Sequence, residues 1–287
     1  MQAIRSILVV VHPSLPETLA LKRAKLIAGV TQSHLHLLAC SKDEQTDFLT
    51  DLTDKLQADG FSASAQTAWH KSLHETIIMV QQTEGCGLVV KQHLPDNPLK
   101  KALLTPDDWK LLRHCPAPVL MVKHDRPWAD GKVLAAVDVG NNDGEHKMLH
   151  ASLVSHAVDI ANLAKTEAHI VSAYPAPMLS AADPTFQLKE TIEARYRSAC
   201  AGFMQEHGLS EAQLHLAEGP ADVLIPQTAH EIGAVVTVMG TVARSGIAGA
   251  LIGNTAEVVL DALETDILVL KPEDVMEHLE TLLASNS

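Results

Sequence analysis

The chain has 287 residues, enough for one large domain or two of ordinary size. Its 22 lysine and arginine residues against 35 aspartate and glutamate residues give a formal net charge of −13, which repels a phosphate backbone and argues against nucleic acid as a partner. Apolar residues make up 46% of the chain and aromatic residues 3%, a composition that favours an α/β fold over an aromatic-rich binding surface.

The N-terminal segment and the cysteines indicate a soluble, cytoplasmic protein. The apolar run at residues 7–11 is too short for a signal peptide, and no stretch approaches the roughly 18 apolar residues of a membrane span. We therefore expect no membrane partner. The four cysteines are scattered without a C-x-x-C pair, which indicates reduced thiols and neither disulfides nor a zinc site.

The first half of the chain predicts an alternation of strands and helices. Residues 7–13 form a short apolar run ended by proline, typical of a strand buried on both faces of a parallel sheet. A segment with helical spacing follows, then a second strand at 34–39 and later strands at 88–90 and 119–123. This alternation predicts right-handed crossovers and a parallel, doubly wound sheet.

The second half repeats the same unit. Residues 133–139 match the first strand and residues 168–173 the second. Near the end of each unit the offset is 148, since residue 236 falls on 88 and residue 267 on 119, whereas at the first strand it is 126. The second unit therefore has about 22 extra residues, which we expect mainly in the proline-rich loop at 174–187.

These matches divide the chain into a first domain at residues 1–124, a linker at 125–131 and a second domain at 132–287. Pro127, Asp130 and Gly131 interrupt both periodicities and mark the linker.

A loop in the second half indicates phosphate binding. It leaves the fourth strand at Met239 and Gly240 and reaches Gly253, Asn254 and Thr255, where a helix is expected to begin. Glycines let backbone amides approach phosphate oxygens, and the free amides of a helix N-terminus attract an anion. The same glycines also suit tight packing, and Asn254 suits a helix cap, so the spacing alone leaves both interpretations open.

The first half lacks this loop. Thr105 followed by Pro106 predicts a self-capped helix start, and the carboxylates of Asp107 and Asp108 in its first turn would repel a phosphate. His12 stands where the second half has Asp138. At the offset of 148, the positions of Gly240, Ala243 and Gly253 are occupied by Gln92, Pro95 and Thr105.

Other motifs for chemistry are absent from the sequence. The sixteen histidines include pairs such as His146 and His150, but each pair lacks a third ligand nearby, so we expect hydrogen-bonded histidines and no metal site. Neither an H-E-x-x-H motif nor a G-x-S-x-G motif occurs, and no catalytic residue is assigned.

The segments at residues 240–260 and 103–123 resemble the universal stress protein family, most closely its tandem E-type members. The second-half loop is similar to the family pattern G-x2-G-x9-G-[ST], with Gly240, Ala243 and Gly253 at the glycine positions. The resemblance runs from the first strand through Lys271. It implies two tandem Rossmann-like sheets of strand order 3-2-1-4-5, a cytoplasmic location and a role in stress resistance.

The resemblance also implies a ligand. Many family members bind ATP or AMP and others bind neither, so the second half is expected to hold an adenine nucleotide, with Mg²⁺ as an optional companion. A slow ATPase and a structural pseudo-dimer without nucleotide are the alternatives. Asp138 would lie near the adenosine or its magnesium, or would simply cap its own loop. The implied contacts are Asp138, Met239, Gly240, Ala243, Arg244, Gly253, Asn254 and Thr255.

The two domains are expected to form a pseudo-dimer within the chain, as single-domain members of this family do between chains. The contact would pair the last strands, at 119–123 and 267–271, because pairing two edges hides them from other proteins. Trp109 and Trp128 are expected to pack at this junction. Further dimerisation of whole chains is left open.

Overall fold

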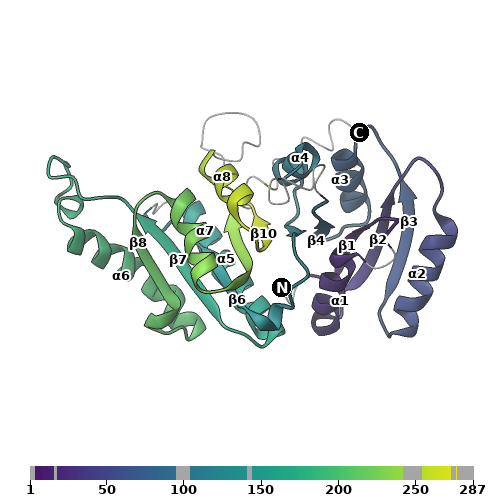
Figure 1. The fold of residues 1–287 in the computed structure, drawn as a ribbon, viewed down its shortest axis with the longest axis horizontal. Helices are drawn as coiled ribbons and strands as arrows, with labels where there is room; N and C mark the ends of the chain where they lie inside the picture. Colours follow the sequence, from purple (N-terminus) through teal and green to yellow (C-terminus); the bar gives the residue numbers. More distant parts are fainter. Residues whose placement is uncertain are drawn as a thin grey trace.

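The computed structural model describes residues 4–15, 18–94, 104–140, 144–241, 254–272 and 276, with the backbone alone at 144–146 and 254–255. Its strands form a ten-stranded sheet of order β3-β2-β1-β4-β5-β10-β9-β6-β7-β8 (Figure 1). Each half of this sheet has the order 3-2-1-4-5, and all pairs within a half are parallel. The predicted fold class is therefore confirmed.

The first half begins with a strand that is buried over almost its whole length, because helices cover both of its faces. The elements are β1 (Ser6–Val11), α1 (Leu19–Thr31), β2 (His34–Cys40), α2 (Thr46–Ala58), β3 (Ala63–Ala68), α3 (Leu73–Thr83), β4 (Leu88–Gln92), α4 (Pro106–His114) and β5 (Val119–Val122).

The second half follows a short 3₁₀ turn, η2 (Trp128–Asp130), and has longer helices on one face. Its elements are β6 (Lys132–Ala136), α5 (Gly144–Ala164), β7 (Ala168–Tyr174), η3 (Pro184–Phe186), α6 (Lys189–His207), η4 (Glu211–Gln213), β8 (Leu214–Glu218), α7 (Ala221–Glu231), β9 (Ala234–Gly240), α8 (Asn254–Ala262) and β10 (Asp266–Leu270).

The extra length of the second half is shared between two longer helices and the loop at 174–187. Helix α5 has 21 residues where α1 has 13, and α6 has 19 where α2 has 13. The expectation that the loop at 174–187 takes most of the insertion is therefore wrong. That loop contains the η3 turn and is closed by a hydrogen bond of 2.8 Å from Met178 N to Phe186 O.

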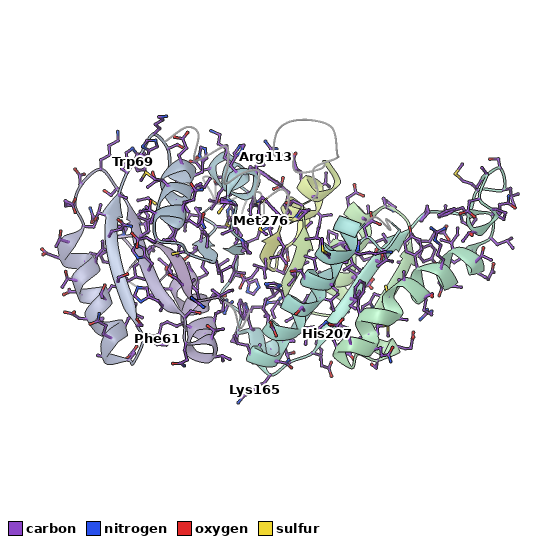
Figure 2. The ribbon with its side chains drawn as sticks, turned by 180° about the vertical axis from the view of Figure 1, so that it is seen from behind. Phe61, Trp69, Arg113, Lys165, His207 and Met276 are labelled. Carbon is purple, nitrogen blue, oxygen red and sulfur yellow. The ribbon has the colours of Figure 1, made fainter. Side chains whose placement is uncertain are left out.

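Two apolar layers hold the helices to the sheet. Helices α1, α2, α5 and α6 pack on one face, and α3, α4, α7 and α8 pack on the other. Side chains fill the space between helices and sheet on both faces (Figure 2). None of the helices in the described ranges has the length and hydropathy of a membrane span.

The halves join through their last strands. Strands β5 and β10 are antiparallel, with Leu120 opposite Leu268 and Met121 opposite Ile267. This confirms the predicted pairing of edge strands and makes the two sheets continuous. Trp128 is 1% exposed at the junction, also as predicted.

A fully buried carboxylate, that of Asp266, ties the junction together. Its Oδ2 accepts hydrogen bonds from Arg23 Nε and Trp128 Nε1, both at 2.8 Å. Its Oδ1 accepts from the backbone N–H groups of Lys123, at 2.8 Å, and His124, at 3.3 Å. One side chain of β10 therefore holds helix α1, the end of β5 and the segment that leads into the second half.

Two lysines cross the junction in a reciprocal way. Lys123 Nζ, just after β5, donates to the carbonyl of Leu263 behind α8, and Lys271 Nζ, just after β10, donates at 2.7 Å to the carbonyl of Cys115, the C-cap of α4. Each cation thus meets the negative end of the other half's last helix. Burial lowers the pKa of each lysine from 10.5 to about 8.

The Asp266 contacts predict a large loss of stability in Asp266→Asn. The substitution leaves Arg23 buried without its counter-charge, which typically costs about 3–5 kcal/mol in the free energy of unfolding. Urea denaturation measures this loss. Asp59→Asn is the control, because Asp59 pairs with Lys25 at the surface and its loss should cost no more than about 1 kcal/mol. Similar losses in both variants would contradict the role assigned to Asp266.

The buried lysines predict a pH dependence. Because the pKa of Lys271 is about 8 in the folded protein and 10.5 when unperturbed, the unfolded chain binds more protons between these pH values, and stability rises with pH across this window. Relative to Lys271→Met, the wild type should gain up to about 3 kcal/mol between pH 7.5 and 10.5. Denaturation at several pH values measures the difference. A difference independent of pH would contradict the burial of a charged lysine, and Lys25→Met serves as the surface control.

Candidate functional site

The candidate site lies at the carboxyl ends of β6 and β9, where the strand order of the second half reverses. These strands are neighbours, with Ala136 opposite Met239, so the loop that carries Asp138 starts beside the end of β9. Ligands of doubly wound sheets bind at this position because the two loops diverge there. The structure therefore brings together the elements that carry Asp138, Met239 and Gly240.

Asp138 is exposed, and its contacts are those of a loop cap. Its Oδ1 accepts a hydrogen bond of 3.3 Å from Gly140 N, and its own N–H donates at 3.3 Å to His150 Nε2 on α5. The carboxylate thus stabilises the turn after β6 and still faces solvent. Its position is compatible with both interpretations of the sequence, a capping group and a ligand contact.

Gly240 has a packing role of its own. A Cβ atom at this position would lie 2.7 Å from Leu149 Cδ2 on α5, closer than carbon atoms normally approach. A side chain here would therefore displace the end of the Leu149 side chain where α5 packs on β9, whatever binds above it. Met239, the preceding residue, is 4% exposed and belongs to the apolar layer beneath α7 and α8.

The remaining predicted contacts are only partly within the described residues. Asn254 and Thr255 form the first turn of α8, where free backbone N–H groups occur. The side chains of these two residues, and all of Ala243, Arg244 and Gly253, lie outside the described residues.

Two tyrosines beside the Asp138 loop were not anticipated from the sequence. Tyr196 on α6 packs against Tyr174 at the end of β7, with ring centroids 5.8 Å apart. A Cβ on Gly140 would lie 2.2 Å from the Tyr196 hydroxyl, so the ring rests on the backbone of this glycine. Burial raises the pKa of Tyr196, and the Asp138 carboxylate adds to the effect. Gly140, two residues after Asp138 in the chain, was the signal that could have indicated a close neighbour.

The equivalent place in the first half is filled by a side chain of the protein itself. The Asp108 carboxylate, 0% exposed, accepts hydrogen bonds from Lys91 Nζ at 2.6 Å, His93 Nδ1 at 2.8 Å and Thr105 N at 3.1 Å. Thr105 Oγ1 in turn accepts from Asp108 N at 3.2 Å, and Pro106 is the first helical residue, which confirms the predicted helix start. Burial would raise the pKa of Asp108, but the His93 hydrogen bond and the Lys91 charge hold it well below its usual range.

The second half has no internal anion of this kind at the matching positions. At the offset of 148, Lys91 corresponds to Met239, and Asp108 corresponds to Ala256 in the first turn of α8. Neither replacement carries a charge. The two halves therefore differ in their electrostatics as well as in their glycines.

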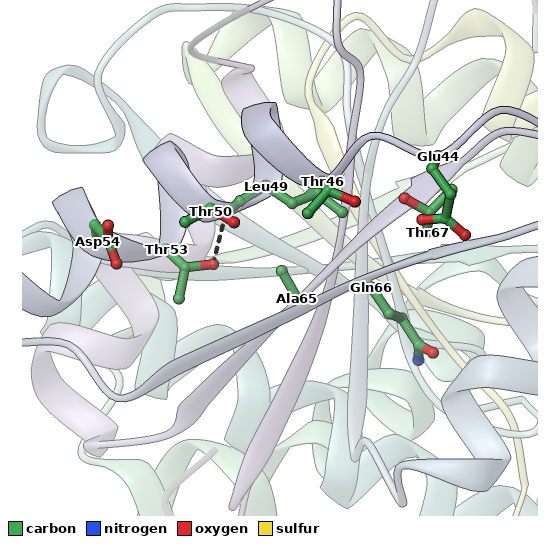
Figure 3. A pocket seen from close by; sticks show the side chains of 9 residues that line it. All are labelled: Glu44, Thr46, Leu49, Thr50, Thr53, Asp54, Ala65, Gln66 and Thr67. Atoms are coloured by element: carbon green, nitrogen blue, oxygen red, sulfur yellow. Dashed lines mark hydrogen bonds between the residues drawn. The ribbon is translucent and has the colours of Figure 1, made fainter.

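A separate hollow of about 430 Å³ lies at the outer edge of the first half, between α2 and β3 (Figure 3). Strands β2 and β1 separate β3 from the point where the strand order reverses. The hollow contains no buried charged group, and nothing in it favours a particular ligand. Its lining consists of Glu44, Thr46, Leu49, Thr50, Thr53, Asp54, Ala65, Gln66 and Thr67.

Comparisons with known proteins agree with this architecture. The model of the Universal stress protein family matches residues 3–123 and 131–271. Universal stress protein E of Escherichia coli (strain K12) is 35% identical over 229 residues, which cover 77% of this chain and 72% of that protein. The Universal stress protein E homolog of Haemophilus influenzae is 31% identical over 261 residues, with 88% and 84% coverage.

A solved structure of high similarity gives the same result. A crystal structure from Pseudomonas aeruginosa UCBPP-PA14 is 64% identical, covers 99% of both chains and has a TM-score of 0.90. A universal stress protein in complex with cAMP matches 50% of this chain and 98% of its own at 22% identity, with a TM-score of 0.34. The cAMP in that structure is a property of that protein alone.

The filled position in the first half predicts the behaviour of Asp108→Asn. The substitution keeps the shape of the side chain but leaves Lys91 buried without its counter-charge, so the melting temperature should fall by roughly 10 °C. Differential scanning calorimetry measures the shift. Asp107→Asn, in the same helical turn but half-exposed, should change it by no more than about 3 °C. If Asp108→Asn melts like the wild type, the carboxylate is not the anchor described here.

Proposed function

Because the chain belongs to the universal stress protein family, we propose that its second half binds an adenine nucleotide, ATP or AMP, in a cytoplasmic role in stress resistance. The observation that carries the proposal is the electrostatic difference between the halves. The first half satisfies Lys91 and His93 with its own Asp108, whereas the second half has the neutral Ala256 at the matching position. The positions of the two cations are neutral as well, with Met239 and Thr241, so a phosphate here meets no buried carboxylate of the kind that fills the first half.

The proposed contacts belong to two neighbouring loops. Backbone amides at Gly240 and Gly253, with the first turn of α8, would hold the phosphates, and Asp138 would lie near the adenosine or its magnesium. We assign the two units to residues 1–124 and 132–287, with 125–131 between them. The full set of proposed contacts is Asp138, Met239, Gly240, Ala243, Arg244, Gly253, Asn254 and Thr255.

Binding without efficient hydrolysis is the favoured form of this proposal. Hydrolysis requires a group that orients water or holds a metal, and Asp138 is the carboxylate available for either task at the end of β6. Its Oδ1 already accepts the Gly140 N–H, which restrains it as a loop cap. A slow ATPase therefore ranks second, and a structural pseudo-dimer is the remaining interpretation if no nucleotide binds.

The proposal predicts opposite results for two matched substitutions. Gly253→Asp should abolish ATP and AMP binding, because it adds bulk and negative charge where α8 begins. Thr105→Asp, at the matching position of the first half, should leave binding unchanged. Ala243→Gly should strengthen binding by about 1 kcal/mol if the extra methyl group weakens the site.

Isothermal titration calorimetry with ATP and AMP tests all three variants. Equal binding by the wild type and Gly253→Asp would rule out the second-half site. Absence of binding in both the wild type and Ala243→Gly would favour the structural pseudo-dimer.

A further inference from the structure

Strand β3 forms one edge of the ten-stranded sheet, and in the described part of the chain it pairs with β2 alone. The carbonyl of Ser62 accepts a hydrogen bond of 2.9 Å from Leu35 N, so it points towards β2. Because the backbone groups of successive residues alternate between the two sides of a strand, those of Ala63, Ala65 and Thr67 point outward. The outer side of β3 therefore presents N–H and C=O groups to which no strand is paired.

This edge lacks the usual protection against a further strand. Its first outward carbonyl, that of Ala63, accepts a hydrogen bond of 3.1 Å from Gln57 Nε2 on α2. The strand itself reads ASAQTA and carries neither a charge nor a proline, the features that commonly keep other strands from pairing with an edge. The opposite edge of the sheet, β8, ends in Glu218, which pairs with Lys189 of α6 at 3.3 Å. Of the two edges, β3 is thus the one open to strand addition.

The hollow between α2 and β3 lies beside this open edge (Figure 3). A strand added to β3 would direct every second side chain towards α2 and into the hollow, as in other proteins that bind peptides at a sheet edge. Leu49, Thr50 and Ala65 line the middle of the hollow, which suits a small or β-branched side chain. The hollow is thus shaped to take side chains of an extended polypeptide and holds no buried charge for a small ligand.

The ends of the hollow are acidic. Glu44 and Asp54, both exposed, lie at its opposite ends in Figure 3. Residues 42–55 as a whole carry five carboxylates against two lysines. The helical stretch 46–54 is about 12 Å long at 1.5 Å per residue, a length that about four residues of an extended strand also span. Two basic side chains four residues apart would therefore reach both carboxylates from the same face of a strand.

We propose that the edge formed by β3 and α2 binds an extended basic segment of a partner protein, which adds to β3 as a further strand. Its recognition pattern is a basic residue, a small or β-branched residue and a second basic residue at alternate positions. The charge argues against a second copy of this chain, because a two-fold pairing of two β3 edges would bring one acidic α2 beside another. This inference does not depend on a nucleotide, and it gives the first half a binding role of its own.

The test is fluorescence anisotropy of the full chain with a labelled peptide, TKTVTKT, whose lysines and valine share one face of a strand. The wild type should bind this peptide, and TETVTET should not bind because its glutamates meet Glu44 and Asp54. N-methylation at one set of alternate residues of TKTVTKT should abolish binding, whereas N-methylation at the other set should not, since only every second N–H of an added strand faces β3. Absence of TKTVTKT binding, or equal effects of the two N-methylated sets, would refute strand addition.

Charge variants test the acidic ends of the hollow. Glu44→Gln combined with Asp54→Asn should weaken TKTVTKT binding about fivefold, because two exposed ion pairs are lost. Glu190→Gln combined with Glu206→Gln is the matched control, since it removes the same charge from exposed positions of α6, the counterpart of α2, and should leave binding unchanged. Equal weakening in both double variants would show attraction by net charge alone and would overturn the proposal.

Ala65→Pro tests the backbone edge. It removes an outward N–H and leaves the hydrogen bonds to β2 in place, so peptide binding should fall at least tenfold while the melting temperature stays near that of the wild type. Unchanged binding in a folded Ala65→Pro variant would contradict the proposal. Sedimentation of the wild type covers the other occupant, because a dimer that Ala65→Pro dissociates would assign this edge to a second copy and overturn the basic partner.

Discussion

The pairing of β5 with β10 depends on buried charges at the junction whose hydrogen-bond partners come in large part from the other half. Asp266 has no solvent exposure, so its negative charge requires the Arg23 guanidinium and three N–H donors around it. Arg23 belongs to α1 and Asp266 to β10, 243 residues apart in the chain. Neither group can be buried until both halves are in place. The junction is therefore an obligatory part of the fold and not a weak contact between independent units.

This constraint also fixes the geometry of the candidate site. Helix α8 immediately precedes β10, and α4 immediately precedes β5, so joining the two strands sets the last helices side by side. Arg113 reaches Glu257 and Leu104 reaches Asp261 because of this arrangement. The electrostatic environment at the start of α8 is consequently decided by residues of both halves. A single half excised from the chain would lack the charged residues that the other half contributes.

The sequence predicted the local features well because they depend on near neighbours. The apolar runs and the constant offset were enough for two repeated units with parallel strands, and Thr105 with Pro106 was enough for the start of α4. The strand order and the pairing of the last strands came from the family resemblance. Partners distant in the chain could not be predicted, because no local pattern relates Arg23 to Asp266 or Asp108 to its buried cations. The place of the insertion was also missed, since extra helical turns in α5 and α6 keep the helical period and leave no mark in it. Of the proposed contacts, the structure describes the backbone of five and the side chains of fewer, so the rest stay predictions.

The late position of β10 has a consequence for synthesis on the ribosome. Strand β5 ends at Val122, and its partner begins at Asp266, so the edge of β5 stays unpaired while more than a hundred further residues are made. At elongation rates of about 5–20 residues per second this interval is on the order of ten seconds. An exposed apolar edge of this kind is a template for aggregation. During the same interval Arg23 has no counter-ion, because Asp266 has not yet been made. The exposed edge of the nascent first half is therefore covered only when the last strand of the second half emerges.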